Sequence, residues 1–375
     1  MKRRSLGIYI HIPFCIRKCN YCDFCSFPNS SPNFMERYTD ELCRRIKVFS
    51  PLAKDHTVDT VYFGGGTPTL LPLECFEKLL GTLKTSFDIS ADAEISCESN
   101  PASIAKDGLS SLRSLGINRL SIGLQSANDN ELKLLGRVHS FEDFKRTFSD
   151  AREVGFDNIS ADLMYGIPDQ TKESFRNTLR ELIALSPEHI SAYGLKIENG
   201  TAFAKNAQKL SLPDEDTEYE MYCEATELLE KAGYHRYEIS NFARVGFESR
   251  HNLRYWRLDE YIGFGVAAHS FFGGERFGNS RDIDTFLKGG DIVSESYTPT
   301  EKDILSEYVM LRLRLSSGLG RKDFKTRFGI DLDSAFPTLK NYVKNNFLSD
   351  DGASVSFTTK GFFVSNYILS DLLDL

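Results

Sequence analysis

The chain has 375 residues, of which 41% are hydrophobic and 26% charged, a composition typical of a folded protein and not of a disordered one. This length corresponds to about two to three domains. Lys and Arg total 45 against 53 Asp and Glu, so the net charge of −8 argues against nucleic acid as a partner of the whole molecule. No run of about 18 apolar residues occurs, so we expect no transmembrane segment and a cytoplasmic location.

Short β-rich runs alternate with amphipathic helical patterns in the first half of the chain. Alternation of this kind predicts parallel β/α units, and six of them predict an α/β fold with a partial (β/α)6 barrel. A doubly wound sheet shows the same alternation, so the periodicity leaves both architectures open. The expected strands are 7–12, 58–63, 94–98, 119–124, 158–164 and 189–195, and the expected helices between them include 33–50, 72–86, 141–154 and 171–185.

The pattern changes in the last third of the chain. A further amphipathic helix over 214–232 ends at Gly233, a residue that commonly terminates helices. After residue 300 the pattern predicts helices over 301–315, 323–328 and 332–346, a short strand over 354–358 and a final helix. We therefore expect a barrel core over 1–200, an extension over 201–298 and a small helix-rich C-terminal domain of winged-helix type over 299–375.

Polar and glycine-rich segments follow the predicted strands at their downstream ends. In β/α folds the active site lies at the carboxyl ends of the parallel strands, so these segments should meet on one face of the molecule. They are Cys15 after the first strand, Gly64–Pro68 after the second, Glu98–Pro101 after the third, Gln125 and Ser126 after the fourth, and Asp162 with Tyr165–Pro168 at the fifth.

Four of the eight cysteines fall within eleven residues, at Cys15, Cys19, Cys22 and Cys25. Three thiolates spaced x3 and x2 on a tight loop can hold three irons of a [4Fe–4S] cluster and leave the fourth iron open. Zinc held by all four cysteines, or a closed four-cysteine cluster that includes Cys25, stays open from the spacing alone. The other cysteines, Cys43, Cys75, Cys97 and Cys223, are scattered, and we expect them to be packing residues.

The x3-x2 cysteine loop after a first strand resembles the signature of the radical S-adenosylmethionine (SAM) family. In that family SAM binds the open iron, and an electron from the cluster cleaves it to a 5′-deoxyadenosyl radical. Further motifs resemble the branch that contains oxygen-independent coproporphyrinogen III dehydrogenase and the haem chaperones of HemW type. These motifs are YIHIPFC (9–15), GGGTP (64–68), RLSIGLQS (119–126), LLGR (134–137) and DLMYGIP (162–168).

The resemblance implies a SAM site whose residues come from several strand ends. Glycines at 65 and 66 let the backbone approach a ligand closely, and Arg137 can pair with a carboxylate in a bidentate manner. Glu98 and Asp162 can accept hydrogen bonds from ribose hydroxyls or from an ammonium group. The complete implied SAM set is Tyr9, Tyr21, Gly65, Gly66, Thr67, Glu98, Gln125, Arg137 and Asp162.

Two features separate the chaperones from the dehydrogenase. The dehydrogenase pattern has a fourth cysteine two residues after the third, where this chain has Phe24, and Cys25 stands one residue later. The string HNLRYW (251–256) resembles the haem-associated H-N-x-x-Y-W motif of the chaperones. It implies a haem site formed by His251, Asn252, Tyr255 and Trp256, in which an imidazole ligates iron and the aromatic rings line the porphyrin. We expect His269 to be a packing residue.

The resemblance therefore implies a haem chaperone that carries a [4Fe–4S] cluster, SAM and haem. Its expected partners are apo-haemoproteins such as respiratory enzymes, and an iron–haem donor such as a bacterioferritin-like protein also fits. Peripheral contact with a membrane-bound partner stays open. The alternative is radical oxidative decarboxylation of coproporphyrinogen III, and a third hypothesis is a non-radical protein with structural zinc or an electron-transfer cluster.

Overall fold

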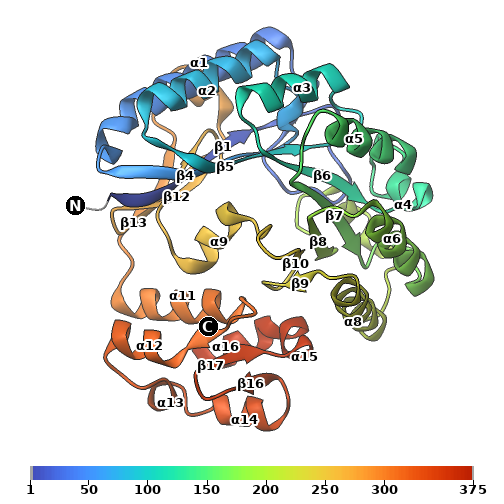
Figure 1. Cartoon of the computed structure of the whole chain (residues 1–375), viewed down its shortest axis with the longest axis vertical. Coiled ribbons are helices and arrows are strands. Elements are labelled where there is room, and N and C mark those ends of the chain that lie inside the picture. Colours follow the sequence, from blue (N-terminus) through green and yellow to red (C-terminus); the bar gives the residue numbers. More distant parts are fainter. Residues whose placement is uncertain (1–2, 374–375) are drawn as a thin grey trace.

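The computed structural model describes residues 3–373. Within these residues, twelve strands form one mixed sheet in the order β14-β13-β12-β11-β1-β4-β5-β6-β7-β8-β10-β9 (Figure 1). Six strands of its parallel part follow each other in chain order, which confirms six parallel β/α units. The parallel strands are β11 (Tyr261–Phe264), β1 (Arg4–Ile12), β4 (His56–Gly65), β5 (Ile89–Ser99), β6 (Arg119–Gln125), β7 (Ile159–Tyr165) and β8 (His189–Gly194).

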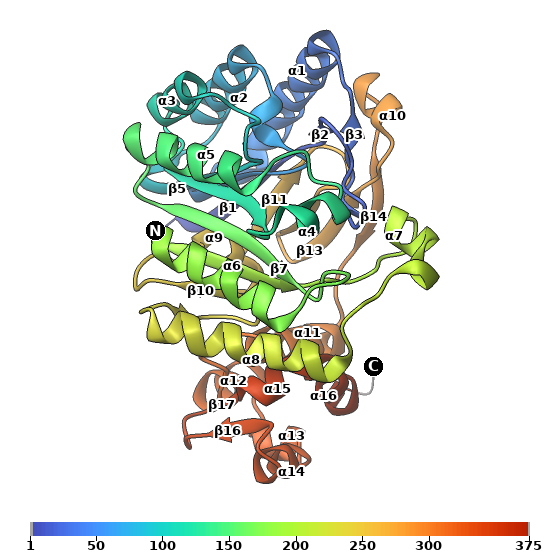
Figure 2. The ribbon, with the colours of Figure 1, turned by 90° about the vertical axis from the view of Figure 1, so that its right-hand side faces the viewer.

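The major helices cover the convex side of this sheet and leave the concave side to other segments (Figure 2). A doubly wound sheet would reverse its strand order and carry helices on both faces, so the structure decides for the partial barrel. The covering helices are α1 (Pro32–Phe49), α2 (Leu73–Ser86), α3 (Lys106–Leu115), α5 (Phe141–Glu153), α6 (Lys172–Leu185) and α8 (Glu215–Lys231). Smaller helices are α4 (Asp129–Leu134), α7 (Ala202–Lys205) and α10 (Ile283–Leu287), with 3-10 turns at Ser50–Ala53, Pro68–Leu70 and Ala207–Lys209.

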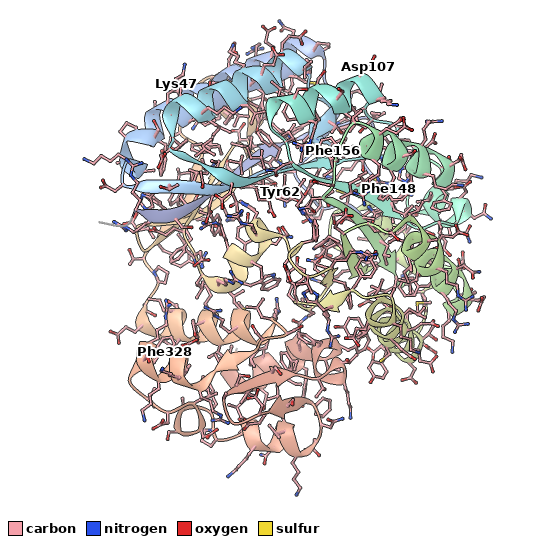
Figure 3. All side chains as sticks on the ribbon, viewed as in Figure 1. Lys47, Tyr62, Asp107, Phe148, Phe156 and Phe328 are labelled. Carbon is pink, nitrogen blue, oxygen red and sulfur yellow. The ribbon has the colours of Figure 1, made fainter. Side chains whose placement is uncertain are left out.

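The two faces of the sheet differ in chemistry because side chains alternate along each strand. Apolar side chains point outward under the helices, as where the ring of Phe63 in β4 lies 5.4 Å from that of Phe76 in α2. Polar and aromatic side chains point into the concave side, where Figure 3 labels Tyr62. The hydrophobic core therefore lies between sheet and helices, and the concave side, here called the lumen, is polar.

Further strands extend the sheet beyond both ends of its parallel part. On the β1 side, β11 continues into β12 (His269–Phe272), β13 (Glu275–Asn279) and β14 (Val293–Tyr297), and on the β8 side the sheet ends with β10 (Asn241–Ala243) and β9 (His235–Arg236). The β12–β13 turn is Gly273-Gly274, and both glycines have positive φ (61° and 82°), which a two-residue hairpin turn requires. The sequence pattern did not predict these strands.

The C-terminal domain packs helices around a small antiparallel sheet of order β15-β17-β16, which contains the strand expected near residue 354. The predicted helix over 332–346 is wrong, because Pro337 interrupts it and leaves two short helices. The elements are α11 (Glu301–Leu313), β15 (Leu319–Gly320), α12 (Arg321–Phe328), α13 (Leu332–Ala335), α14 (Leu339–Lys344), β16 (Leu348–Asp350), β17 (Ser354–Phe357), α15 (Thr359–Phe363) and α16 (Ser365–Leu373). Among the described helices, none combines the length and the apolar character needed to cross a bilayer.

One short helix, α9 (Arg250–Arg257), lies on the concave side of the sheet (Figure 1). Its N-terminus is held by the buried Glu94 of β5, whose carboxylate accepts hydrogen bonds from the backbone N–H groups of Arg250 and His251, each 3.1 Å long. A carboxylate at this position neutralises the positive end of the helix dipole.

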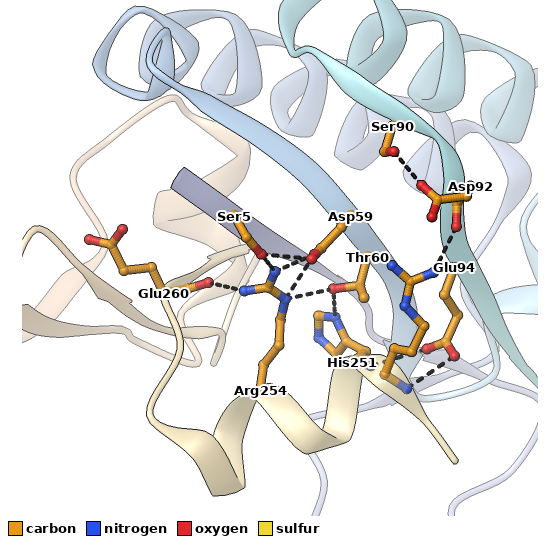
Figure 4. Close-up of polar contacts among 10 residues, drawn as sticks. Ser5, Asp59, Thr60, Ser90, Asp92, Glu94, His251, Arg254 and Glu260 are labelled. Atoms are coloured by element: carbon orange, nitrogen blue, oxygen red, sulfur yellow. Dashed lines mark hydrogen bonds and ion pairs between the residues drawn. The ribbon is translucent and has the colours of Figure 1, made fainter. Parts of the chain in front are cut away.

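The other end of α9 is held by Arg254, which is 4% exposed. Its guanidinium pairs with Asp59, donates to Ser5 and donates to the backbone oxygen of Glu260 at 2.9 Å (Figure 4). The helix is therefore fixed to β1, β4 and β5 by charged hydrogen bonds at both ends.

We expect Arg254→Met to lower the free energy of unfolding by about 2 kcal/mol, because it leaves the partly buried Asp59 carboxylate without its cation. Urea unfolding followed by circular dichroism measures this change. Arg257→Met, an exposed position on the same helix, is the matched control and should change the midpoint little. Equal effects of the two substitutions would contradict the assigned anchor.

Candidate functional site

The cysteine loop, residues 15–25, lies between two short parallel strands, β2 (Phe14–Cys15) and β3 (Phe27–Pro28). Side chains of the loop attach it to the segment after α4. Arg17 donates to the backbone oxygen of Gly136 (Nε to O, 3.1 Å), and Asn20 donates to that of Leu134 (Nδ2 to O, 2.8 Å). These bonds place the loop over the carboxyl ends of the strands, as its position after the first strand predicts.

A cavity of about 340 Å³ opens beneath this loop. Cys15, Cys19 and Cys22 line it from the loop, and all three are free thiols that are partly buried. The opposite wall consists of side chains from the ends of five strands. That wall contains Gly65 and Gly66 of the β4 end, Glu98 of β5, Gln125 of β6, Asp162 of β7 and Tyr193 of β8.

The four clustered cysteines have different surroundings, since three line the cavity and the fourth does not. Within residues 3–373, no three His, Cys, Asp or Glu side chains converge closely enough to hold one metal ion. Cys25 is 7% exposed, is absent from the cavity lining and belongs to the hydrophobic core. A site formed by all four cysteines would therefore require the loop to refold.

The protein environment keeps two of these thiols protonated. Burial raises the pKa of Cys22 to about 11, and burial also raises the pKa of Cys15 above that of a free thiol. Iron binds the thiolate form, so metal binding must displace protons from these residues. Arg137 contacts a loop sulfur directly, with its Nη1 3.6 Å from Cys19 Sγ, and the charge of Lys18 opposes the rise in the pKa of Cys22.

The glycine run after β4 has a packing role that the structure makes explicit. Gly65 has a φ of 115°, and a Cβ at Gly66 would stand 2.6 Å from the backbone oxygen of Phe14. The backbone N–H of Gly65 donates to Glu98 Oε2 at 3.0 Å, while the hydroxyl of Tyr62 donates to Oε1 at 3.0 Å. Glycine is therefore required for the turn, and the turn positions the Glu98 carboxylate at the cavity.

Burial raises the pKa of Glu98 to about 7, although the hydrogen bond from Tyr62 opposes this shift. Burial also raises the pKa of Asp162, which accepts from Ser121 Oγ at 3.1 Å. The buried Arg119 guanidinium lines the same cavity, and its charge opposes both of these pKa shifts. The two carboxylates can still accept hydrogen bonds from hydroxyl or ammonium groups of a ligand.

Arg137 reaches the cavity from the loop after α4. It donates to the backbone oxygen of Gly123 at 2.9 Å and to Asn100, while its buried Nε has no hydrogen-bond partner among the described residues. A carboxylate that took the free Nε–H would satisfy this donor. The residue therefore fits the carboxylate-binding role that the resemblance implies for it.

Gln125 differs from the other cavity residues in its backbone. It adopts a φ of 69°, in the left-handed region, at the point where the pairing of β6 with β7 shifts register. Strain of this kind in a non-glycine residue concentrates at functional sites. The positive φ of Gln125 therefore supports its place in the candidate site, for which its polarity alone was weak evidence.

Seven of the nine residues of the implied SAM set line the cavity, and two do not. Tyr9 lies behind the wall, with its ring 6.2 Å from that of Tyr62 and its hydroxyl 3.0 Å from His11 Nδ1. Thr67 is buried beneath the loop, where its hydroxyl donates to Cys15 Sγ over 3.7 Å. The seven that line it are Tyr21, Gly65, Gly66, Glu98, Gln125, Arg137 and Asp162.

The sequence pattern singled out Asn100 only as part of the polar segment 98–101 and gave Arg119 no role, although both residues line the cavity. Asn100 connects Arg137 to Thr67, because its amide nitrogen donates to Thr67 Oγ1 at 2.6 Å and its oxygen accepts from the guanidinium. Arg119 is 1% exposed and lines the cavity from the first position of β6. Asn100 could have been assigned to the site because it stands two residues after Glu98 at the end of the same predicted strand. No motif in the sequence marks Tyr62 or Ser121 as residues that point into the lumen.

The haem-associated motif forms α9 and lies against the same site. His251 is 0% exposed, with Nδ1 2.9 Å from Thr60 Oγ1 and Nε2 2.8 Å from the hydroxyl of Tyr255. Burial lowers its pKa to about 3, so the ring is neutral. Ligation of haem iron by His251 would require one of these two hydrogen bonds to break. Asn252 lines the cavity, and Trp256 is partly exposed.

His269 lies elsewhere than expected. Its side chain is 64% exposed on β12, so the expectation that it is a packing residue is wrong. His269 begins β12, which returns alongside β11 after the turn. The two main chains approach so closely that a Cβ at Gly263 of β11 would stand 2.3 Å from the His269 backbone oxygen. Propensity and pattern could not show that this turn carries the histidine out of the core.

We expect Glu98→Gln to be increasingly favourable for stability as pH rises. The raised pKa of Glu98 means that the folded state binds a proton more tightly than the unfolded state, so the wild type loses stability from about pH 4.5 through 7. The difference in unfolding free energy should move by about 2 kcal/mol in favour of the variant between pH 5 and 8. Urea unfolding of both proteins across this range, without SAM, measures it, and a pH-independent difference would contradict the raised pKa.

The comparisons with known proteins agree with this geometry. Residues 9–182 match the Radical SAM superfamily, and residues 300–364 match the HemN C-terminal domain. The heme chaperone HemW of Bacillus subtilis is 37% identical over 97% of this chain and 98% of its own length, and that of Escherichia coli is 34% identical over 98% of each.

Coproporphyrinogen III oxidase (HemN) from Escherichia coli, a radical SAM enzyme, has a similar structure, with a TM-score of 0.87 over 100% of this chain and 91% of that one, at 27% sequence identity. Its likeness extends through the C-terminal domain, since the whole chain is covered. On the full-length identity to its relatives, the chain belongs to the HemW family of the radical SAM superfamily.

Proposed function

We propose that this protein is a haem chaperone that binds haem, a [4Fe–4S] cluster and SAM and delivers haem to apo-haemoproteins such as respiratory enzymes. The observation that supports it most is the combination of full-length HemW relatives with Phe24 at the site where the dehydrogenase pattern has a cysteine. Phe24 is 66% exposed and lines the cavity mouth, so an apolar ring occupies the place of a fourth thiol.

In this proposal the cluster is held by Cys15, Cys19 and Cys22. When bound, cluster and SAM supply one-electron chemistry at the cavity. The residues of the chain bind SAM and orient it. The Arg137 Nε–H donates a hydrogen bond to the SAM carboxylate, and the carboxylates of Glu98 and Asp162 accept hydrogen bonds from its cationic and hydroxyl groups. The cysteine loop covers the cavity and limits access of water to it.

The proposed partners are an iron–haem donor, such as a bacterioferritin-like protein, and the recipient apo-haemoproteins. We place the protein in the cytoplasm, where a reducing environment keeps all eight cysteines as thiols. Contact with a membrane-bound recipient would be peripheral.

A second candidate function is oxidative decarboxylation of coproporphyrinogen III. The similarity in structure to the Escherichia coli HemN enzyme favours it, because the likeness covers the whole chain. The chain contains the same kind of cavity at the strand ends, so the fold alone does not separate the two functions.

We expect anaerobically reconstituted protein to bind about four iron and four sulfide, and Cys19→Ala to lose the cluster, because only three thiols are available as ligands. Iron and sulfide analysis with visible absorbance measures this. Cys223→Ala, on α8 away from the cavity, is the matched control and should keep full iron content. Stoichiometric zinc without iron–sulfur absorbance would refute the proposed cluster.

Haem binding and turnover distinguish the two functions. We expect haemin titration of the wild-type protein to give a shifted Soret band, and the reduced protein with SAM and coproporphyrinogen III to yield no protoporphyrinogen. Product formation at a substantial rate would show that the enzyme hypothesis is right and the chaperone proposal wrong. Absence of any haem complex would exclude the chaperone independently of turnover.

A further inference from the structure

Exposed apolar side chains gather on and beside the cysteine loop. Among the described residues, thirteen large apolar side chains are exposed, and four of them belong to this loop or to the segment that is bonded to it. They are Ile16, Phe24, Leu134 and Val138. Single exposed apolar side chains are common on proteins and carry no meaning, whereas a group of them in one place marks an interaction site.

Contacts in the structure join these side chains into one surface. Ile16 and Val138 line the same small groove. Arg17 lies against the main chain beside this groove, because its Nη2 donates to the backbone oxygen of Gly136 at 2.5 Å. The apolar pair and the guanidinium therefore form one continuous part of the surface.

The other half of the loop completes this surface. The Lys18 ammonium donates to the backbone oxygen of Phe24 at 3.1 Å, and Asn20 holds the main chain of Leu134 against the loop. Lys18 and Phe24 also line the mouth of the cavity. The surface, here called the loop face, consists of Ile16, Arg17, Lys18, Phe24, Leu134 and Val138.

The loop face is positive although the chain as a whole carries a net charge of −8. Arg17 and Lys18 are both exposed, and they donate to backbone oxygens while pairing with no carboxylate within residues 3–373. The carboxylate of Asp23, on the same loop, is offset by Arg281 at 3.5 Å.

Two further cations flank the loop face. Lys133 is exposed on α4 next to Leu134. Lys205 is exposed on α7, which the loop holds nearby, because the backbone N–H of Phe203 donates to the Asn20 oxygen at 2.9 Å. Figure 2 shows β2, β3, α4 and α7 on one side of the molecule. Opposite charge on a partner would therefore be attracted to this side.

The loop face is also the shortest route from solvent to the candidate cluster site. Ile16 directly follows Cys15, and Lys18 directly precedes Cys19, so one residue separates the exposed surface from a thiol. An electron that entered from the convex side would have to cross the helices and the sheet instead (Figure 2). Because electron transfer slows steeply with distance, a donor gains most by approaching the loop face.

We propose that the loop face is the docking surface for a small acidic protein that carries a one-electron flavin centre. This rests on the cluster of the proposed function. The apolar side chains supply the contact, and the cations on and beside the face attract carboxylates of the partner. One electron passes from the flavin hydroquinone anion, which becomes the neutral semiquinone, to the cluster, which goes from its 2+ to its 1+ state. No proton or atom is transferred.

Charge and position favour this occupant over others. In a symmetric dimer, a second copy of the chain would bring the same cations against each other, which like-charge repulsion opposes. A lipid surface has no electron to deliver to the cluster site. Redox encounters bury less than about 1,200 Å² and depend on steering by opposite charge, which suits a face of six residues.

The test is reduction of the anaerobically reconstituted protein by flavodoxin hydroquinone in stopped-flow absorbance, with binding of oxidised flavodoxin measured by calorimetry. For the double variant Lys18→Glu/Lys133→Glu we expect reduction slowed and binding weakened at least about tenfold at low ionic strength, with most of the salt dependence lost. Lys302→Glu/Lys322→Glu, at two exposed positions of the C-terminal domain, changes the net charge equally and is the matched control. Ile16→Ser should weaken binding about fivefold and keep the salt dependence, because it removes apolar contact and no charge.

The 5-deazariboflavin radical, an uncharged reductant that needs no docking, should reduce every variant at the wild-type rate. Wild-type flavodoxin kinetics in Lys18→Glu/Lys133→Glu, or an equal loss in the control, would overturn the proposal. So would loss of binding to phosphatidylglycerol vesicles in the first variant with unchanged flavodoxin kinetics, which would assign the face to a lipid surface. A wild-type protein that neither reductant reduces contradicts the cluster of the proposed function itself, and haemin titration of the same variants tests haem binding separately.

Discussion

The hydrogen bonds from the N-terminus of α9 to Glu94 are the interaction on which the interior of the molecule depends. A barrel lined by glutamate, arginine and tyrosine cannot bury those groups without partners, since an unpaired buried charge costs several kcal/mol. The helix supplies partners: its backbone N–H groups bind Glu94, and the His251 ring stacks on Tyr62 with centroids 5.2 Å apart. Tyr62 in turn donates to Glu98, so the helix supports the cavity wall from below.

The motifs that contain no cysteine lie in two different positions relative to the cavity. The glycine run and Arg137 face the cavity directly, whereas the H-N-x-x-Y-W residues lie mostly behind it and act through packing and hydrogen bonds. The imidazole of His251 is suited to that work because burial keeps it neutral and both nitrogens find oxygen partners.

The sequence predicts what depends on local chemistry. Apolar runs with polar downstream ends predict the six parallel strands, and the spacing of the cysteines predicts the loop. Because Glu98 and Asp162 stand at such strand ends, the sequence also predicts that they lie on the cavity wall. The features that the sequence does not predict depend on contacts between segments that are far apart in the chain. The partnership of Asn100 with Arg137, the burial of His251 and the exposure of His269 arise only when strands are paired. The Gly273-Gly274 hairpin and the break at Pro337 had local signals in the glycine pair and the proline, and at Pro337 the helical periodicity on both sides obscured the signal.

The sheet is not closed on itself, because β14 and β9 end it without pairing to each other. The C-terminal domain contacts both sides of this gap. Arg276 of β13 pairs with Glu307 of α11 at 2.6 Å, and Arg236 of β9 donates to Thr359 at 3.1 Å. The backbone also pairs there, since Ile239 N donates to Arg314 O and Ser316 N donates to Tyr237 O, each at 3.0 Å. The opening of the barrel is therefore bridged by a second domain through two side-chain contacts and one short backbone bridge, whereas a closed barrel would be sealed by a continuous ladder between its first and last strands.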